Sequence, residues 1–143
     1  MLFGKKQRRI TRLLLVEDEP LVAFDTEHLL SDDNYEVVAT VDRVADALAI
    51  LADGVDVHLV LADVTLADGS GMDVARAAAA REVPVLFVTG GCPDGAQDVA
   101  AGVLAKPYGK RDLLAAIAAI EATMDGRRPK RMPSGLRLFD QVS

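Results

Sequence analysis

The chain has 143 residues, of which half are hydrophobic, and a formal net charge of −6. This length suits a single domain with its own core, and no apolar run approaches the roughly 20 residues of a membrane-spanning helix. The basic N-terminal stretch lacks the apolar segment of a signal peptide, and the single Cys92 excludes an internal disulfide, so we expect a cytoplasmic protein.

The charges are divided unevenly along the chain. Residues 13–125 carry 21 acidic residues against 6 basic ones, a formal charge of −15, whereas the two ends are basic. Such a body repels phosphates, so we expect neither nucleic acid nor a membrane as a partner. We divide the chain into a basic N-terminal lead (1–10), one folded domain (11–125) and a basic C-terminal tail (126–143). We expect that tail to be flexible, and we favour disorder of its final LRLFDQVS over the alternative of a short docking segment.

Short apolar runs alternate with helical patterns along the domain. In chain order the patterns predict strand 12–16, helix 20–30, strand 36–41, helix 44–52, strand 57–63, helix 72–81, strand 84–89, strand 103–105 and helix 112–124. In the first helix, Leu21, Phe24 and Leu29 are the predicted buried face. Between the last two strands, residues 90–95 contain three glycines and a proline that oppose helix formation, so we expect a short or irregular fourth helix within Ala96–Ala101.

This order predicts an α/β fold with a doubly wound parallel sheet. Strands that are apolar on both faces and separated by helices belong to sheets covered on both sides. In such folds ligands bind outside the carboxyl ends of the strands. The site should therefore be sought where the predicted strands end.

Polar side chains follow four of the predicted strands. Glu17 and Asp18 follow the first strand, Asp63 ends the third, Thr89 ends the fourth and Lys106 follows the fifth. Each feature alone is ordinary for a turn, a cap or a solvated surface. Their shared position at carboxyl ends indicates that they converge on one edge of the sheet.

These residues suit the chemistry of a phosphoryl group. Two carboxylates about 4 Å apart repel by roughly 4 kcal/mol at an effective dielectric near 20, and a hard divalent cation such as Mg²⁺ removes that cost. Lys106 supplies a positive charge, Thr89 a hydroxyl donor, and Gly90 a free backbone N–H. Asp63 would then be the nucleophile that forms an aspartyl phosphate.

The stretches VEDEP, LVLADVTLADGSG, VPVLFVTG and LAKPY together resemble the receiver domain of two-component response regulators, the CheY-like family. The resemblance covers about residues 11–125. It implies a five-stranded, flavodoxin-like (βα)₅ fold with strand order 2-1-3-4-5. It also implies Asp63 as the phosphoacceptor.

The resemblance further implies the roles of the surrounding residues. Asp18, Asp63 and the backbone carbonyl of Thr65 match the protein ligands of Mg²⁺, and Glu17 would act through water. Thr89 matches the hydroxyl residue that moves onto the phosphate, and Lys106 matches the lysine that pairs with it. The phosphoryl group would come from a histidine kinase or phosphotransfer protein, with self-phosphorylation and autodephosphorylation as the only catalysis, so the protein is not classed as an enzyme.

Two features depart from the usual family pattern. Val103 stands three positions before the lysine, where relatives carry an aromatic switch residue, and the segment from Thr89 to Lys106 is short. The stretch PVLFVTGG partly matches the PFxFATGY stretch of alphaproteobacterial single-domain regulators called FAT GUY proteins. That similarity implies a role in stress signalling.

Only 18 residues follow residue 125, too few for a DNA-binding or enzymatic output domain. We therefore expect a stand-alone regulator that signals through an unknown downstream protein or serves as a phosphate sink. The alternative is a receiver-fold binding module that works without phosphorylation. A haloacid-dehalogenase-like phosphatase and a flavodoxin-like FMN carrier are weaker readings, since the second Asp of the first and the flavin loop of the second are missing.

Overall fold

Six strands form the central sheet of the computed structural model, which describes residues 8–139. They are β1 (Arg12–Val16), β2 (Glu36–Val41), β3 (Leu59–Ala62), β6 (Val85–Thr89), β7 (Gly102–Ala105) and β8 (Leu136–Leu138). Their order is β2-β1-β3-β6-β7-β8, with β1, β2, β3, β6 and β7 parallel and β8 antiparallel. The parallel part confirms the expected order, and β8 extends it.

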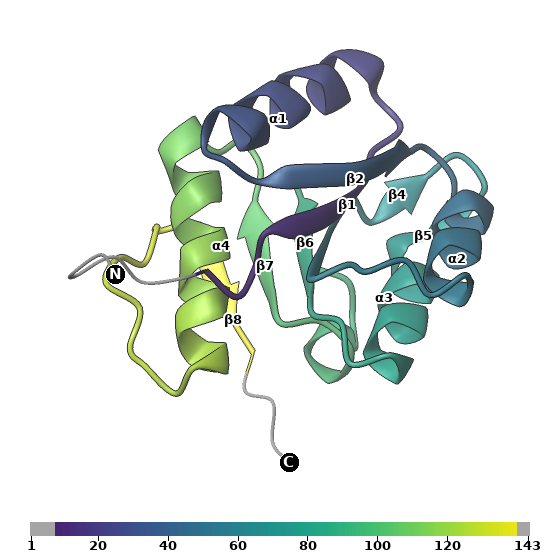
Figure 1. The fold of residues 1–143 in the computed structure, drawn as a ribbon. Coiled ribbons are helices and arrows are strands. Elements are labelled where there is room, and N and C mark those ends of the chain that lie inside the picture. Colours follow the sequence, from purple (N-terminus) through teal and green to yellow (C-terminus); the bar gives the residue numbers. More distant parts are fainter. Residues whose placement is uncertain (1–7, 140–143) are drawn as a thin grey trace.

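Helices cover both faces of this sheet. α1 (Pro20–Asp32) and α4 (Lys110–Met124) lie on one face, and α2 (Val44–Ala52) and α3 (Gly71–Ala80) lie on the other (Figure 1). Successive residues of β1 point to opposite faces, so Leu13 and Leu15 pack in the core under α1 and α4, while Leu14 packs under α2 and α3. No helix in residues 8–139 is long and apolar enough to cross a membrane.

The connections around the site differ from the predicted elements at one place and agree with them at another. Strand β3 ends at Ala62, so Asp63 lies just beyond it, and the following loop forms a small antiparallel ribbon of β4 (Thr65–Leu66) and β5 (Gly69–Ser70). Between β6 and β7 only a 3₁₀ turn, η1 (Ala96–Asp98), is present. That turn confirms the expected short fourth helix.

The predicted buried face of α1 was wrong for two of its three residues. Leu21 is 81% exposed and Phe24 is 57% exposed. Ala23, Thr26 and Leu30 face the core instead. Ala23, Thr26 and Leu30 recur at spacings of three and four residues, as on one helix face, whereas Leu21 and Phe24 lie on another stripe of α1 that faces solvent.

The C-terminal tail was also wrongly expected to be flexible throughout. Residues 136–138 form β8 beside β7, and Leu136 is buried. The N–H of Phe139 extends the pairing by donating to the carbonyl of Ala101 at 2.9 Å. Residues 140–143, the end of the predicted disordered segment, lie outside the described part.

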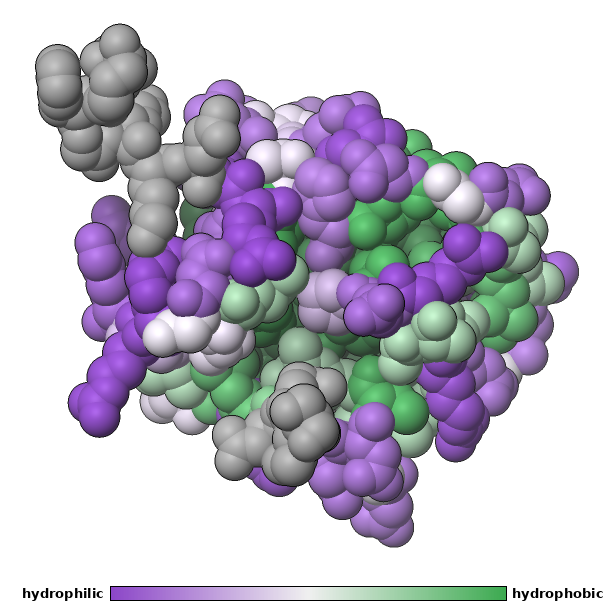
Figure 2. Space-filling model, turned by 60° about the horizontal axis from the view of Figure 1, so that its bottom comes forward, coloured by the Kyte–Doolittle hydropathy of each residue, from purple (hydrophilic) through white to green (hydrophobic). Residues whose placement is uncertain are grey.

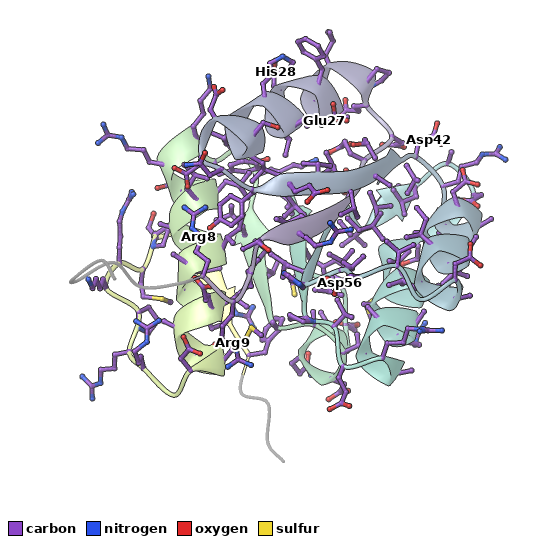
Figure 3. All side chains as sticks on the ribbon, viewed as in Figure 1. Arg8, Arg9, Glu27, His28, Asp42 and Asp56 are labelled. Atoms are coloured by element: carbon purple, nitrogen blue, oxygen red, sulfur yellow. The ribbon has the colours of Figure 1, made fainter. Side chains whose placement is uncertain are left out.

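Residues 8–10 of the basic lead are joined to the domain. The guanidinium of Arg8 lies 4.1 Å from the centre of the Tyr35 ring, and Arg9 bonds the Asp125 carboxylate at 2.9 Å (Figure 3). Ile10 is fully buried. Residues 1–7 of the lead lie outside the described part.

Gly71 holds the start of α3 against the chain that follows β3. Its N–H donates to the carbonyl of Val64 at 2.6 Å, and a Cβ at this position would overlap the carbonyl oxygen of Asp63. Both partners are backbone, which cannot swing aside as a flexible side chain can. Glycine at position 71 therefore fixes the backbone of Asp63.

We expect Gly71→Ala to lower the free energy of unfolding by about 2–4 kcal/mol because the added methyl group displaces this backbone. Urea denaturation measures the loss. Gly91→Ala is the matched control, since a Cβ there meets nothing within 4 Å. Equal stability of Gly71→Ala and the wild type would contradict the close approach.

Candidate functional site

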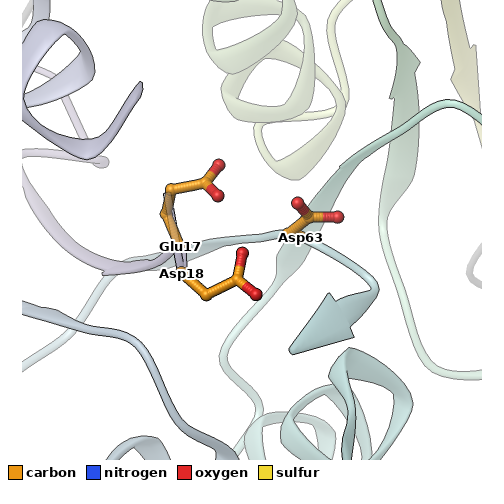
Figure 4. A group of neighbouring side chains, drawn as sticks. All are labelled: Glu17, Asp18 and Asp63. Atoms are coloured by element: carbon orange, nitrogen blue, oxygen red, sulfur yellow. The ribbon is translucent and has the colours of Figure 1, made fainter. Parts of the chain in front are cut away.

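Three carboxylates meet at the carboxyl edge of the sheet. Glu17 and Asp18 follow β1, and Asp63 follows β3, the strand hydrogen-bonded to it. The N–H of Asp63 continues the pairing by donating to the carbonyl of Val16 at 3.0 Å. One oxygen from each carboxylate lies within 4.8 Å of the others, and the three groups point into the same space (Figure 4).

Lys106 brings a positive charge to these carboxylates. It follows β7, and its backbone N–H donates to the carbonyl of Thr89 at the end of β6. Its Nζ lies 3.0 Å from Oδ2 of Asp63 and 4.0 Å from Oε1 of Glu17. Three carboxylates thus share one lysine, and a net negative charge remains.

Burial makes this charge imbalance more costly. Glu17 is only 7% exposed, and burial raises its pKa, an effect that the N–H of Glu19 and the charge of Lys106 partly oppose. Burial alone would lower the pKa of Lys106, but its hydrogen bond to Asp63 and the nearby carboxylates outweigh burial and raise it. The site favours positive charge.

Two residues outside the predicted site shape the loop after Asp63. Gly71 fixes its backbone, as described above. Asp68 accepts the N–H of Val44 at 2.6 Å and that of Ala45 at 3.1 Å, which caps the start of α2 and ties the loop to it. These bonds lower the pKa of Asp68. A loop Asp with no acidic neighbour gave no sequence signal for this distant cap.

Four other predicted residues lie in β4, in β7 and at or just beyond the end of β6. The hydroxyl of Thr89 is turned toward its own loop, where it bonds the carbonyl of Gly91 at 3.0 Å. Gly90 is exposed, with open space where a Cβ would be. Thr65 is exposed in β4, two residues after Asp63, and Val103 is buried in β7.

The donor set suits a hard divalent cation. Every charged ligand offered here is a carboxylate oxygen, and no sulfur or imidazole is part of the cluster. Oxygen ligands of this kind suit Mg²⁺, which keeps several waters and uses one or two carboxylates. Asp63 also has one oxygen fixed by the N–H of Val64 at 2.7 Å and the other by Lys106. The two oxygens of the Asp63 carboxylate are therefore held in defined positions.

We expect Lys106→Gln to lower the free energy of unfolding by about 1–2 kcal/mol at pH 7, because it leaves Glu17 and Asp63 without their cation. The folded pKa of Lys106 lies above its usual 10.5, so the difference should persist to that pH and fade only as pH rises further. The difference in unfolding free energy should also shrink on acidification, because Glu17 becomes protonated at a pH above its usual pKa of 4.5.

Thermal denaturation across pH measures this difference, with Lys110→Gln, an exposed lysine, as the control. A loss of stability that does not change on acidification would contradict the electrostatic explanation.

The comparisons with known proteins agree with this geometry. The family description "Response regulator receiver domain" matches residues 13–118. The phyllosphere-induced regulator PhyR of Methylorubrum extorquens is 34% identical over 113 residues, which cover 75% of this chain and 42% of PhyR. The chain spans about half the length of the curated relatives it matches.

Solved structures give the same result. The solution structure of SdrG from Sphingomonas melonis is 37% identical, with a TM-score of 0.64 over 78% of this chain and 96% of SdrG. The BeF₃-activated conformation of SdrG is 39% identical, with a TM-score of 0.61 over 76% and 94%. With its parallel sheet, its acidic edge and these relatives, the chain belongs to the response regulator receiver family.

Proposed function

We propose that Asp63 accepts a phosphoryl group from the phosphohistidine of a histidine kinase or phosphotransfer protein, and that the phosphorylated domain signals through a protein partner. The observation that carries this proposal is the Asp63 carboxylate itself. It stands beside Glu17 and Asp18 with its Oδ2 bonded to Lys106 at 3.0 Å. An unreactive surface aspartate would not need this enclosure.

In the proposed step an oxygen of Asp63 attacks phosphorus while the bond from phosphorus to the donor nitrogen breaks, and the imidazole leaves. Asp18, Asp63 and the Thr65 carbonyl would hold Mg²⁺, with Glu17 acting through water. When bound, the ion neutralises charge on the transferring group.

The chain's own groups would stabilise the product. Lys106, already at Asp63, pairs with the new phosphoryl oxygens. The Thr89 hydroxyl exchanges its bond to Gly91 for one to the phosphoryl group, beside the backbone N–H of Gly90. SdrG, a relative with a BeF₃-activated conformation, supports this reading because beryllofluoride imitates a phosphoryl group on a carboxylate.

The exposed face of α1 suits the phosphodonor protein. Leu21 and Phe24 present large apolar side chains to solvent on the helix that begins right after Glu19. A groove of about 580 Å³ between α1 and the start of α4 opens beside Lys106 and Tyr108. Leu21 and Phe24 do not line this groove, so a partner would cover the outer face of α1 and reach the groove beside Lys106 to bring its phosphohistidine to Asp63.

Phosphorylation with acetyl phosphate tests the acceptor. We expect wild-type protein with Mg²⁺ to gain one phosphoryl group that is labile to hydroxylamine, as an acyl phosphate is, and Asp63→Asn to gain none. Intact-protein mass spectrometry measures both. Asp73→Asn, an exposed aspartate paired with Arg76, is the control and should label normally. Normal labelling of Asp63→Asn would refute the assignment.

The exposed face of α1, where the phosphodonor protein would bind, is tested separately. Phe24→Ser should slow phosphotransfer from a histidine kinase at least about tenfold, while the rate with acetyl phosphate stays at the wild-type value, because only the protein donor needs the surface. Val55→Ser, also an exposed apolar residue, is the control. An equal loss with both donors would mean that Phe24 acts on the site and not on docking.

A further inference from the structure

Strand β8 occupies an edge of the sheet that would otherwise be open. It pairs antiparallel with β7, with Gly102 opposite Leu138 and Leu104 opposite Leu136. The N–H of Ala105 donates to the carbonyl of Gly135 at 2.9 Å. Without β8, the outer N–H and C=O groups of β7 would face solvent as a ready template for another strand.

The sequence of β7 is fitted to this neighbour. A Cβ at Gly102 would lie 2.8 Å from the carbonyl oxygen of Arg137 and 3.2 Å from a methyl carbon of Leu138. The three atoms nearest to that Cβ all belong to β8. Glycine at position 102 therefore serves the strand that pairs with β7.

The hold on β8 is slight, however. The strand has three residues, and of these only Leu136 is buried. The connection between α4 and β8 is bonded to α4, and not to β8, by the ion pair of Arg131 and Asp112 at 2.7 Å. A three-residue strand at an edge is a weakly held element that a competing strand can replace.

We propose that the outer edge of β7 is a docking site for an extended segment of a partner protein, and that β8 is its displaceable in-chain occupant. The docked partner segment would add a strand to the sheet, as peptides do in β-augmentation. The inference goes beyond the proposed function and needs neither Mg²⁺ nor phosphate.

The chemistry of the partner segment follows from β8. Leu136 and Leu138 point toward the α4 side of the sheet, where Leu136 packs in the core, and the exposed Arg137 lies between them. The domain beneath carries a formal charge of −15. We therefore expect an apolar–basic–apolar segment, whose apolar residues fill the positions of the two leucines.

A groove continues from the end of β8. The groove is lined by Leu138 and Phe139, by Val83 and Pro84, and by Met124 at the end of α4. Its volume is about 660 Å³. Figure 2 shows green, apolar residues gathered on this face between hydrophilic ones. A partner segment longer than β8 would extend into this groove and bury more apolar surface than β8 does.

The test opens the edge in the full chain. Leu136→Asp/Leu138→Asp removes the two apolar anchors from β8 and leaves β7 unchanged. Gly102→Ala instead adds a methyl group to β7 that displaces β8. We expect amide exchange of Ala105 to rise at least about tenfold in both variants while Phe87 in β6 stays protected. Met132→Ala, an exposed residue of the same tail, is the control and should leave Ala105 protected.

A peptide of sequence PSGLRLF is then added to the variant Leu136→Asp/Leu138→Asp. A tethered strand acts at an effective concentration on the order of millimolar, so the free peptide is used at that concentration. It should restore protection at Ala105, and should fail to do so when Gly102→Ala is also present or when both leucines of the peptide are aspartates.

Three results would overturn the proposal. Ala105 that stays protected in both variants would mean that β8 does not cover the edge. A peptide without effect would mean that the edge does not accept strands. Protection regained through dimerisation of the opened variant, detected by light scattering, would make a second copy the occupant.

Discussion

The structure depends on the crowding of three carboxylates around one lysine at the carboxyl edge of the sheet. Parallel pairing of β1 with β3 sets Asp63 beside Glu17 and Asp18, and the pairing of β6 with β7 places Lys106 within 3.0 Å of Asp63. A protein selected for stability alone would not retain this partly buried excess of negative charge. The cation and phosphoryl group of the proposed function would relieve this imbalance.

The same sheet links this edge to the C-terminal strand. Lys106 directly follows Ala105, whose N–H is bonded to Gly135 in the turn before β8. The short η1 turn and Val103 leave this side of the domain without a full helix or the aromatic residue expected from its relatives. Arg137 and Phe139 lie on the Val103 side of the sheet, and Phe139 packs against the core cluster that contains Val103. The C-terminal strand thus supplies cover that the shortened connection lacks.

Much of the fold was predictable from the sequence. Short apolar runs such as LLLV and LVLA indicate buried strands, and the helices between them favour parallel pairing, so the strand ends predicted the meeting of Glu17, Asp18, Asp63 and Lys106. The buried face of α1 was not predictable, because Leu21 and Phe24 form an apolar stripe as regular as the true one. Their exposure fits the donor surface proposed for α1, and packing within the domain does not account for it.

The prediction for the end of the chain was wrong for a different reason. Leu136–Leu138 is a three-residue run inside a basic segment, and its strand exists only because β7 offers an open edge and Gly102 leaves room for it. Contacts of this kind, like the approach of Gly71 to the Asp63 backbone, join residues far apart in sequence. Local pattern carries no information about them.

Amide NMR of the full chain, first with Mg²⁺ and then with beryllofluoride, tests the central claim most directly. The account predicts that Mg²⁺ at millimolar concentration shifts the amides of Asp18 and Asp63, and that beryllofluoride then shifts Thr89 and Lys106. If neither addition moves these signals, the acidic edge is not a phosphoacceptor site, and the fold serves as a binding module that works without phosphorylation.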